Sequence, residues 1–189
     1  MNYGWIDLRD HPERVADIPE AARSEGLSRL LRVIADPVSQ VISIGCDCHA
    51  FERSTPENDS PRWSVGGYIA VAFKDAERNL DPNKLVEVAC YILSEIGPSS
   101  EHQIAFEMIV EPLKYFFDHP DCHALMIKPF GRGDDEPQAW AAFDYAAGAV
   151  ADAIQRSRQI TPGNPGPTPP RTTAARRRRR PEGYLGTRT

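Results

Sequence analysis

The stretch QVISIGCDCHAFE, residues 40–52, constrains the fold of this chain more than any other, because its apolar and polar residues alternate. Side chains of a β-strand point alternately to the two faces of a sheet. The pattern therefore predicts a strand with one face in a core and the other toward water. The core face is expected to carry Ile42, Ile44, Cys46, Cys48 and Ala50. The opposite face is expected to carry Ser43, Asp47 and His49.

Hydrophobic periodicity and breaker residues predict the other elements of the chain. Strands are expected at residues 63–74, 103–111 and 122–130, where apolar residues alternate. Helices are expected at residues 19–36, 81–96 and 137–158, where apolar residues recur at a spacing of three or four. The helix at 81–96 has the clearest limits, because Asp81-Pro82 precedes it and Gly97-Pro98 follows it.

The order of these elements predicts two strand–strand–helix units, at residues 40–97 and 102–158. Two such units can form one sheet with both of their helices packed on the same face. The predicted fold class is therefore α+β, with two layers and a four-stranded, mainly antiparallel sheet. The additional N-terminal helix is expected to cover an end of the sheet or part of its second face.

The C-terminal segment, residues 161–189, differs in composition from the rest of the chain. It has almost no large apolar residues, and it holds 6 of the 17 prolines. A segment that cannot bury apolar surface does not offset the entropy lost on folding. The sequence therefore predicts a single domain at residues 1–160, followed by a disordered basic tail rich in proline and arginine at residues 161–189.

Charge divides the chain in the same way. The tail has seven arginines and one acidic residue, Glu182, so its net charge is +6. Because the whole chain carries −5, residues 1–160 carry −11. An acidic surface repels nucleic acid and attracts basic partners, whereas a basic tail does the reverse. The sequence therefore predicts a basic macromolecular partner for the domain, and nucleic acid or an acidic surface as a partner for the tail.

The four cysteines lie in or beside apolar segments. The N-terminus is polar rather than signal-like, and no run of about 18 apolar residues is present. These features predict free thiols, no membrane span and a cytoplasmic location.

A zinc site is the alternative use of the cysteines, because thiolates and imidazoles are common zinc ligands. The residues of that type are Cys46, Cys48, His49, His119, Cys122 and His123. Strand alternation places His49 on the face opposite Cys46 and Cys48, however, so buried apolar cysteines are the preferred interpretation. No metal and no cofactor is predicted.

Asp47 and His49 are the principal candidates for chemistry, because they lie two residues apart on the predicted polar face. A histidine with carboxylates can transfer protons or hold a divalent metal ion. If the strand at 103–111 lies alongside, Glu107 and Glu111 would join them. These four residues form the predicted catalytic set, and the alternative interpretation is an ordinary solvated sheet face.

Two further motifs suggest anion binding. Gly131-Arg132-Gly133 stands between a predicted strand and a predicted helix, where glycine-rich loops hold phosphate. Acidic residues at 134–136 would repel phosphate there, so the glycines are interpreted as loop formers. The arginine run of the tail could bind nucleic acid, an acidic protein surface or anionic lipid, or could serve as a solubilising tail. The run consists of Arg176, Arg177, Arg178, Arg179 and Arg180.

The leading functional hypothesis is a non-enzymatic, acidic protein–protein interaction module, such as an inhibitor or immunity-type protein that binds a basic partner. It depends on the charge of residues 1–160 and on the lack of a strong catalytic motif. One alternative is a small enzyme that uses His49 and Asp47 with nearby glutamates, with or without a metal ion. The other alternative is a nucleic-acid-associated protein that acts through the arginine tail.

Overall fold

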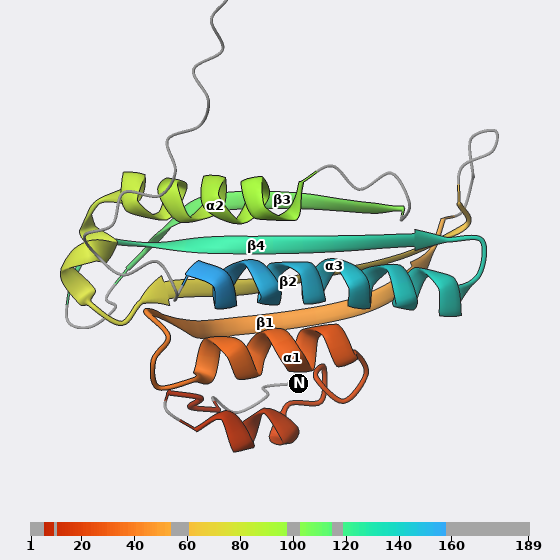
Figure 1. Ribbon diagram of the computed structural model, residues 1–189, viewed down its shortest axis with the longest axis horizontal. Helices are drawn as coiled ribbons and strands as arrows, with labels where there is room; N and C mark the ends of the chain where they lie inside the picture. The colour runs from red at the N-terminus through yellow and green to blue at the C-terminus, as the bar shows by residue number, and fades with distance from the viewer. Residues whose placement is uncertain (1–5, 10, 54–60, 98–102, 115–118, 158–189) are drawn as a thin grey trace, which may run out of the picture. The chain divides into compact units, whose positions relative to one another are not determined.

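The computed structural model describes residues 6–9, 11–53, 61–97, 103–114 and 119–157 (Figure 1). The predicted tail at 161–189 lies outside these residues, as does its arginine run. The boundary between residues 160 and 161 therefore stays a prediction.

Four strands form one sheet in which every neighbouring pair is antiparallel. The strands are β1 (Val41–Glu52), β2 (Trp63–Phe73), β3 (Ile104–Leu113) and β4 (Cys122–Gly133). Their order across the sheet is β1-β2-β4-β3, so β1 and β3 are the two edges. This arrangement confirms the predicted α+β class and its four-stranded antiparallel sheet.

The helices of the two repeated units are α2 (Pro82–Ile96) and α3 (Glu136–Ser157). Asp81 caps α2, because its side chain accepts a hydrogen bond from the backbone N–H of Asn83 at 3.0 Å. Gly97 ends the same helix with a φ of +65°, a conformation that favours glycine. Of its predicted apolar stripe, Leu85, Ala89 and Ile92 are buried, whereas Val88 and Ile96 pack against the core but are only partly buried. Two short 3₁₀ helices are also present, η1 (Pro12–Asp17) and η2 (Ala76–Leu80).

The N-terminal helix α1 (Glu25–Ala35) begins later than the expected residue 19. Its N-cap is Ser24, whose hydroxyl accepts from the backbone N–H of Leu27 at 3.0 Å and donates to Asp144 of α3 at 2.5 Å. A Cβ at Gly26 would lie 2.2 Å from the carbonyl oxygen of Asp144, so glycine allows the two helices to touch. Helix α1 therefore packs against α3 and beside the edge strand β1 (Figure 1), which is the first of its two expected positions.

One β-bulge corrects the predicted faces of β1. The register shifts between Ser43 and Gly45, so that Ile42 lies opposite Ala72 and Cys46 lies opposite Ile69. Directly opposed residues share a face, and an extra residue in one strand reverses the alternation beyond it. The prediction that Ile42 shares a face with Cys46 is therefore wrong, as is the prediction that Ser43 shares a face with Asp47.

All three described α-helices lie on one side of the sheet, and α3 contacts the sheet most closely (Figure 1). A Cβ at Gly131 would lie 2.2 Å from the backbone nitrogen of Phe143, and one at Gly133 would lie 2.5 Å from that of Ala139. The glycines of the Gly131-Arg132-Gly133 motif therefore belong to β4 and admit the backbone of α3. Their expected position in a loop is wrong, and this packing leaves no phosphate cradle at these glycines.

Candidate functional site

The sheet face directed away from α3, called the open face here, carries none of the described helices. Its residues are those that alternate along each strand with the helix-covered residues, and the register extends this assignment from β2 and β4 to β1 and β3. Its larger apolar members include Phe51, Tyr68, Ile109, Met126 and Phe130. Each of these is at least partly exposed. The open face is therefore more apolar than the solvated polar face that antiparallel sheets ordinarily show.

Asp47 and His49 lie on the open face, as predicted, and both side chains are exposed. Asp47 is opposite Tyr68, and His49 is opposite Gly66. The His49 ring also lies near the Phe51 ring, with centroids 5.9 Å apart. The Asp47 carboxylate and the His49 imidazole therefore both lie at the β1 edge of the sheet.

Glu107 and Glu111 also belong to the open face, but they lie on β3, at the other edge. Strands β2 and β4 separate them from β1, which corresponds to about 14 Å at the usual strand spacing. The Glu107 carboxylate instead pairs with the Lys128 ammonium across 3.1 Å. The sheet order therefore does not bring the four predicted catalytic residues together.

Asp47 and His49 also border different hollows. Asp47 lines a cavity of about 330 Å³, which His49 does not line. His49 lines a depression of about 510 Å³, together with Arg23, Glu136 and Trp140. A small ligand in either hollow would touch only one member of the pair, so the geometry gives the pair no shared reaction centre.

The Cys46 and Cys48 thiols point to the helix-covered side of β1, because they oppose Ile69 and Gly67. Burial, with smaller contributions from Glu20 and Asp47, raises the pKa of the Cys46 thiol to about 12. Burial and the same acidic groups raise the pKa of Cys48 to about 11. Both thiols therefore stay protonated at neutral pH.

Within the described ranges, no three histidine, cysteine, aspartate or glutamate side chains come together as a metal site. All four cysteines are free, with Cys90 exposed and Cys48 and Cys122 buried. The described helices also include none that is long and apolar enough to cross a membrane.

The cavity that Asp47 lines lies at the bulge of β1, between that edge strand and the N-terminal segment. Its apolar wall consists of Ile6, Leu8, Ile18, Pro19 and Ile44. Its polar wall includes Glu20, Ser43, Cys46, Asp47 and Tyr68. The described part of the lining has two carboxylates and no basic side chain, so the cavity is electronegative.

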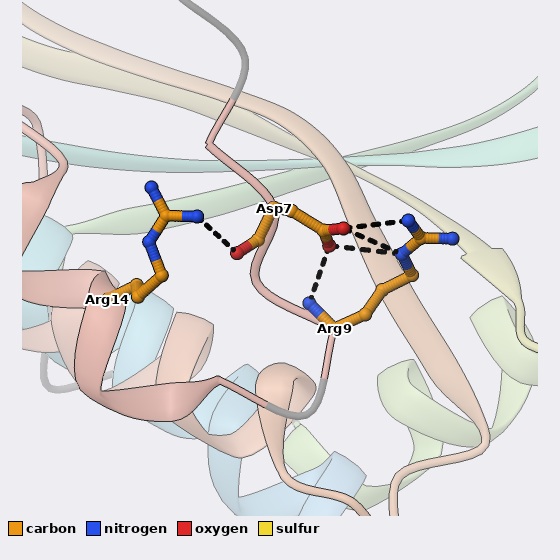
Figure 2. Close-up of polar contacts among 3 residues, drawn as sticks. All are labelled: Asp7, Arg9 and Arg14. Atoms are coloured by element: carbon orange, nitrogen blue, oxygen red, sulfur yellow. Dashed lines mark hydrogen bonds and ion pairs between the residues drawn. The ribbon is translucent and has the colours of Figure 1, made fainter.

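A local charge clamp shapes the N-terminal wall of this cavity (Figure 2). The Arg9 side chain donates to both carboxylate oxygens of Asp7, at 2.7 to 3.2 Å, and the Arg9 backbone N–H donates to the same carboxylate. Arg14 of η1 donates to the Asp7 carbonyl oxygen at 3.3 Å. The bonds from Arg9 lower the pKa of Asp7 to about 2. The clamp thus fixes the segment whose flanking side chains, Ile6 and Leu8, line the cavity.

Glu20 and Tyr68 are the functional candidates that the sequence pattern missed. Tyr68 lies in the expected strand at 63–74, but its position beside Asp47 depends on the register of β1 and β2. Burial, followed by the charge of Asp47, raises the pKa of the Tyr68 hydroxyl. Glu20 lies in a turn rather than in the expected helix, and no local pattern marks it as a neighbour of β1.

No protein-family model matches this chain, and neither a curated protein nor a solved structure is significantly similar to it.

Proposed function

We propose that this protein is a non-enzymatic interaction module that binds a basic macromolecular partner through the open face of its sheet. The observation that carries the proposal is the open face itself. It is four strands wide, it holds the exposed Phe51 and partly exposed apolar side chains such as Met126 and Phe130, and no described helix packs on it. Contiguous exposed apolar surface is typical of protein interaction sites.

The size of this face suits a macromolecular partner. Four strands of about ten residues, at the usual spacings, span roughly 19 by 33 Å, or about 600 Å² on one partner. A standard protein interface buries about 800 Å² per partner, including its rim. The open face and the side chains around it therefore provide most of one specific interface.

Charge selects the kind of partner. Residues 1–160 carry −11, so two copies of the chain would repel through these segments, whereas a basic protein would be attracted. Opposite charges speed association, and salt weakens this effect. An inhibitor or immunity-type role, in which the module neutralises a basic protein, follows from the same argument.

The enzymatic alternative has less support from the geometry. Its proposed residues Asp47 and His49 line different hollows, and Glu107 and Glu111 lie at the opposite sheet edge. General acid–base catalysis needs its groups within hydrogen-bond reach of one substrate. The interaction hypothesis does not require these four side chains to lie within reach of one ligand.

The test begins with capture of partners by the full chain from extracts of the source cell, followed by binding measurements on the purified candidates. We expect a basic protein whose association rate falls at least tenfold between 0.05 and 0.5 M salt, on the order seen for steered complexes. A double variant of the open face, Phe51→Ser with Met126→Ser, should weaken binding at least tenfold.

The matched control is Val86→Ser with Leu93→Ser, on the outer surface of α2. Val86 is 46% exposed and Leu93 45%, close to the 42% of Phe51. The control should bind normally, and the melting temperatures of both variants should show that they remain folded. Equal losses in the two variants, or self-association as the only binding detected, would contradict the proposal.

A further inference from the structure

We infer that the cavity at the β1 bulge is a receptor for a basic side chain, a guanidinium or ammonium group on an apolar stem. The inference rests on the proposed function, because it names the group of the basic partner that enters this site.

The walls match the two ends of such a side chain. Ile6, Leu8 and Ile44 offer apolar surface to an alkyl stem, since long basic side chains bury their methylene groups against such surface. Glu20 and Asp47 provide two negative charges for the cationic head. The Tyr68 ring lies next to Asp47 across the strand pair, where a cation can also contact an aromatic face.

The polar groups of this cavity are available to a ligand. Among the residues that the structure describes, the side chains of Glu20, Asp47 and Tyr68 have no hydrogen-bond or ion-pair partner. This contrasts with Asp7, which Arg9 neutralises close by (Figure 2). The positive charge nearest in sequence to the cavity wall is therefore already paired, whereas none of the described residues pairs with the carboxylates of the cavity.

The electrostatics of the neighbouring groups agree with this geometry. Both Glu20 and Asp47 contribute to the raised pKa values of Cys46 and Tyr68, after the larger effect of burial. The part of these shifts that comes from the two carboxylates shows that their charge disfavours further negative charge in the cavity. The same field favours a cation.

Volume and composition favour an organic cation over a metal ion. A cavity of about 330 Å³ is at the lower end of the range for small-ligand sites, which is suitable for one long side chain. Calcium prefers six to eight oxygen ligands, whereas half of this lining is aliphatic. Arginine is the better fit of the two basic residues, because its planar head can pair with a carboxylate and stack on a ring.

The test uses acetyl-arginine-amide as the probe and the full, isotope-labelled chain, observed by NMR. We expect saturable shifts of the backbone amides of Gly45, Asp47 and Tyr68, with a dissociation constant of about 1 mM, as ligand efficiency suggests for a molecule of this size. Acetyl-citrulline-amide, which has the same shape without the charge, should bind at least tenfold more weakly. Equal binding of the two probes, or shifts confined to other residues, would overturn the inference.

Variants test the two carboxylates. Glu20→Gln with Asp47→Asn should weaken the arginine probe about tenfold or more. The control Glu25→Gln with Glu87→Gln removes the same charge from exposed positions on α1 and α2 and should leave the affinity within twofold. Equal weakening in both pairs would show that only net charge matters, which contradicts a specific receptor.

Arginines of this chain's own tail are a second source of the same chemistry. A full-length variant with Arg176 to Arg180 replaced by glutamine distinguishes the sources. If the probe binds this variant much more tightly than the native chain, the receptor is real and the tail occupies it. If both bind equally, the cavity is free for a partner.

The assay with the probe needs no partner, so it separates this inference from the proposed function. If the probe binds specifically but no basic partner is found, the result would support the receptor and contradict the interaction module. A basic partner can also bind the Glu20→Gln with Asp47→Asn variant as tightly as the Glu25→Gln with Glu87→Gln control. That result would support the interaction module and contradict the receptor.

Discussion

The two faces of the sheet differ in how far their side chains are buried, because the described helices pack on only one of them. On β4, Ile127 points toward the helices and is fully buried, whereas the next side chain back, Met126, belongs to the open face and is partly exposed. On the helix-covered side, Gly131 and Gly133 admit a helix backbone, whereas on the open face Gly66 lies against the Phe130 ring. The comparison teaches that the described helices cover the apolar side chains of one face, whereas several large apolar side chains of the other face stay at least partly exposed.

The largest expected difference between the faces is in core packing. Ile127→Ala should lower the free energy of unfolding by about 2–5 kcal/mol, because it empties a fully buried site. Met126→Ala should lower it by about 1 kcal/mol or less, because that side chain already contacts water. Urea unfolding of the two variants at equal concentration measures both values.

Equal losses for the two positions would break the comparison. That result would mean that the open face is covered as completely as the other, by segments outside the described residues or by a second copy. Repeating the measurement at tenfold lower protein concentration would distinguish these causes, because only association depends on concentration.

The second contrast concerns glycines on the two faces. Gly131→Ala should destabilise by about 1–3 kcal/mol, because the new Cβ would lie 2.2 Å and 2.5 Å from backbone atoms of Phe143 and Ala139. Gly66→Ala should cost less, about 1 kcal/mol or below, since its closest contact is the partly exposed Phe130 ring at 3.0 Å. Thermal melts of both variants test this, and a larger loss for Gly66→Ala would show that the Phe130 ring is held rigidly.

Local patterns in the sequence were sufficient to predict the class of fold. Alternation in β1 to β4 and the cap and stop of α2 are local signals, and they locate those elements within a few residues. The predicted start of α1 at residue 19 was wrong because Pro19 suits a turn as well as a helix. Ser24, which caps α1, also donates a hydrogen bond to Asp144, 120 residues away. A contact so distant in sequence leaves no local pattern.

The candidate site was less predictable, because it depends on pairing between distant segments. Alternation placed Asp47, His49, Glu107 and Glu111 on one face, but it carries no information on strand order. The insertion of β4 between β2 and β3 puts the glutamates at the far edge. The cavity depends in turn on the bulge at Ile44 and on the N-terminal segment, neither of which follows from hydrophobic periodicity.

The smallest expected effect concerns the thiol of Cys46, on the helix-covered side of β1. Because burial raises its pKa from 9.0 to about 12, the folded state holds this proton more tightly than the unfolded state. The resulting stabilisation is fully present below about pH 9 and is lost as pH rises toward 12. Tyrosines and lysines titrate in the same range, so the measurement is the difference between the native chain and Cys46→Ala.

The slope of stability against pH between 9 and 11 should be less negative in Cys46→Ala than in the native chain. The control variant is Cys90→Ala, which removes an exposed thiol instead of a covered one. Alkylation gives an independent readout: at pH 8, a thiol with a pKa of about 12 holds on the order of a thousandfold less thiolate than one with a pKa of 9.0. Iodoacetamide should therefore modify Cys90 long before Cys46, and equal rates would show that the edge strand opens and exposes its covered face to water.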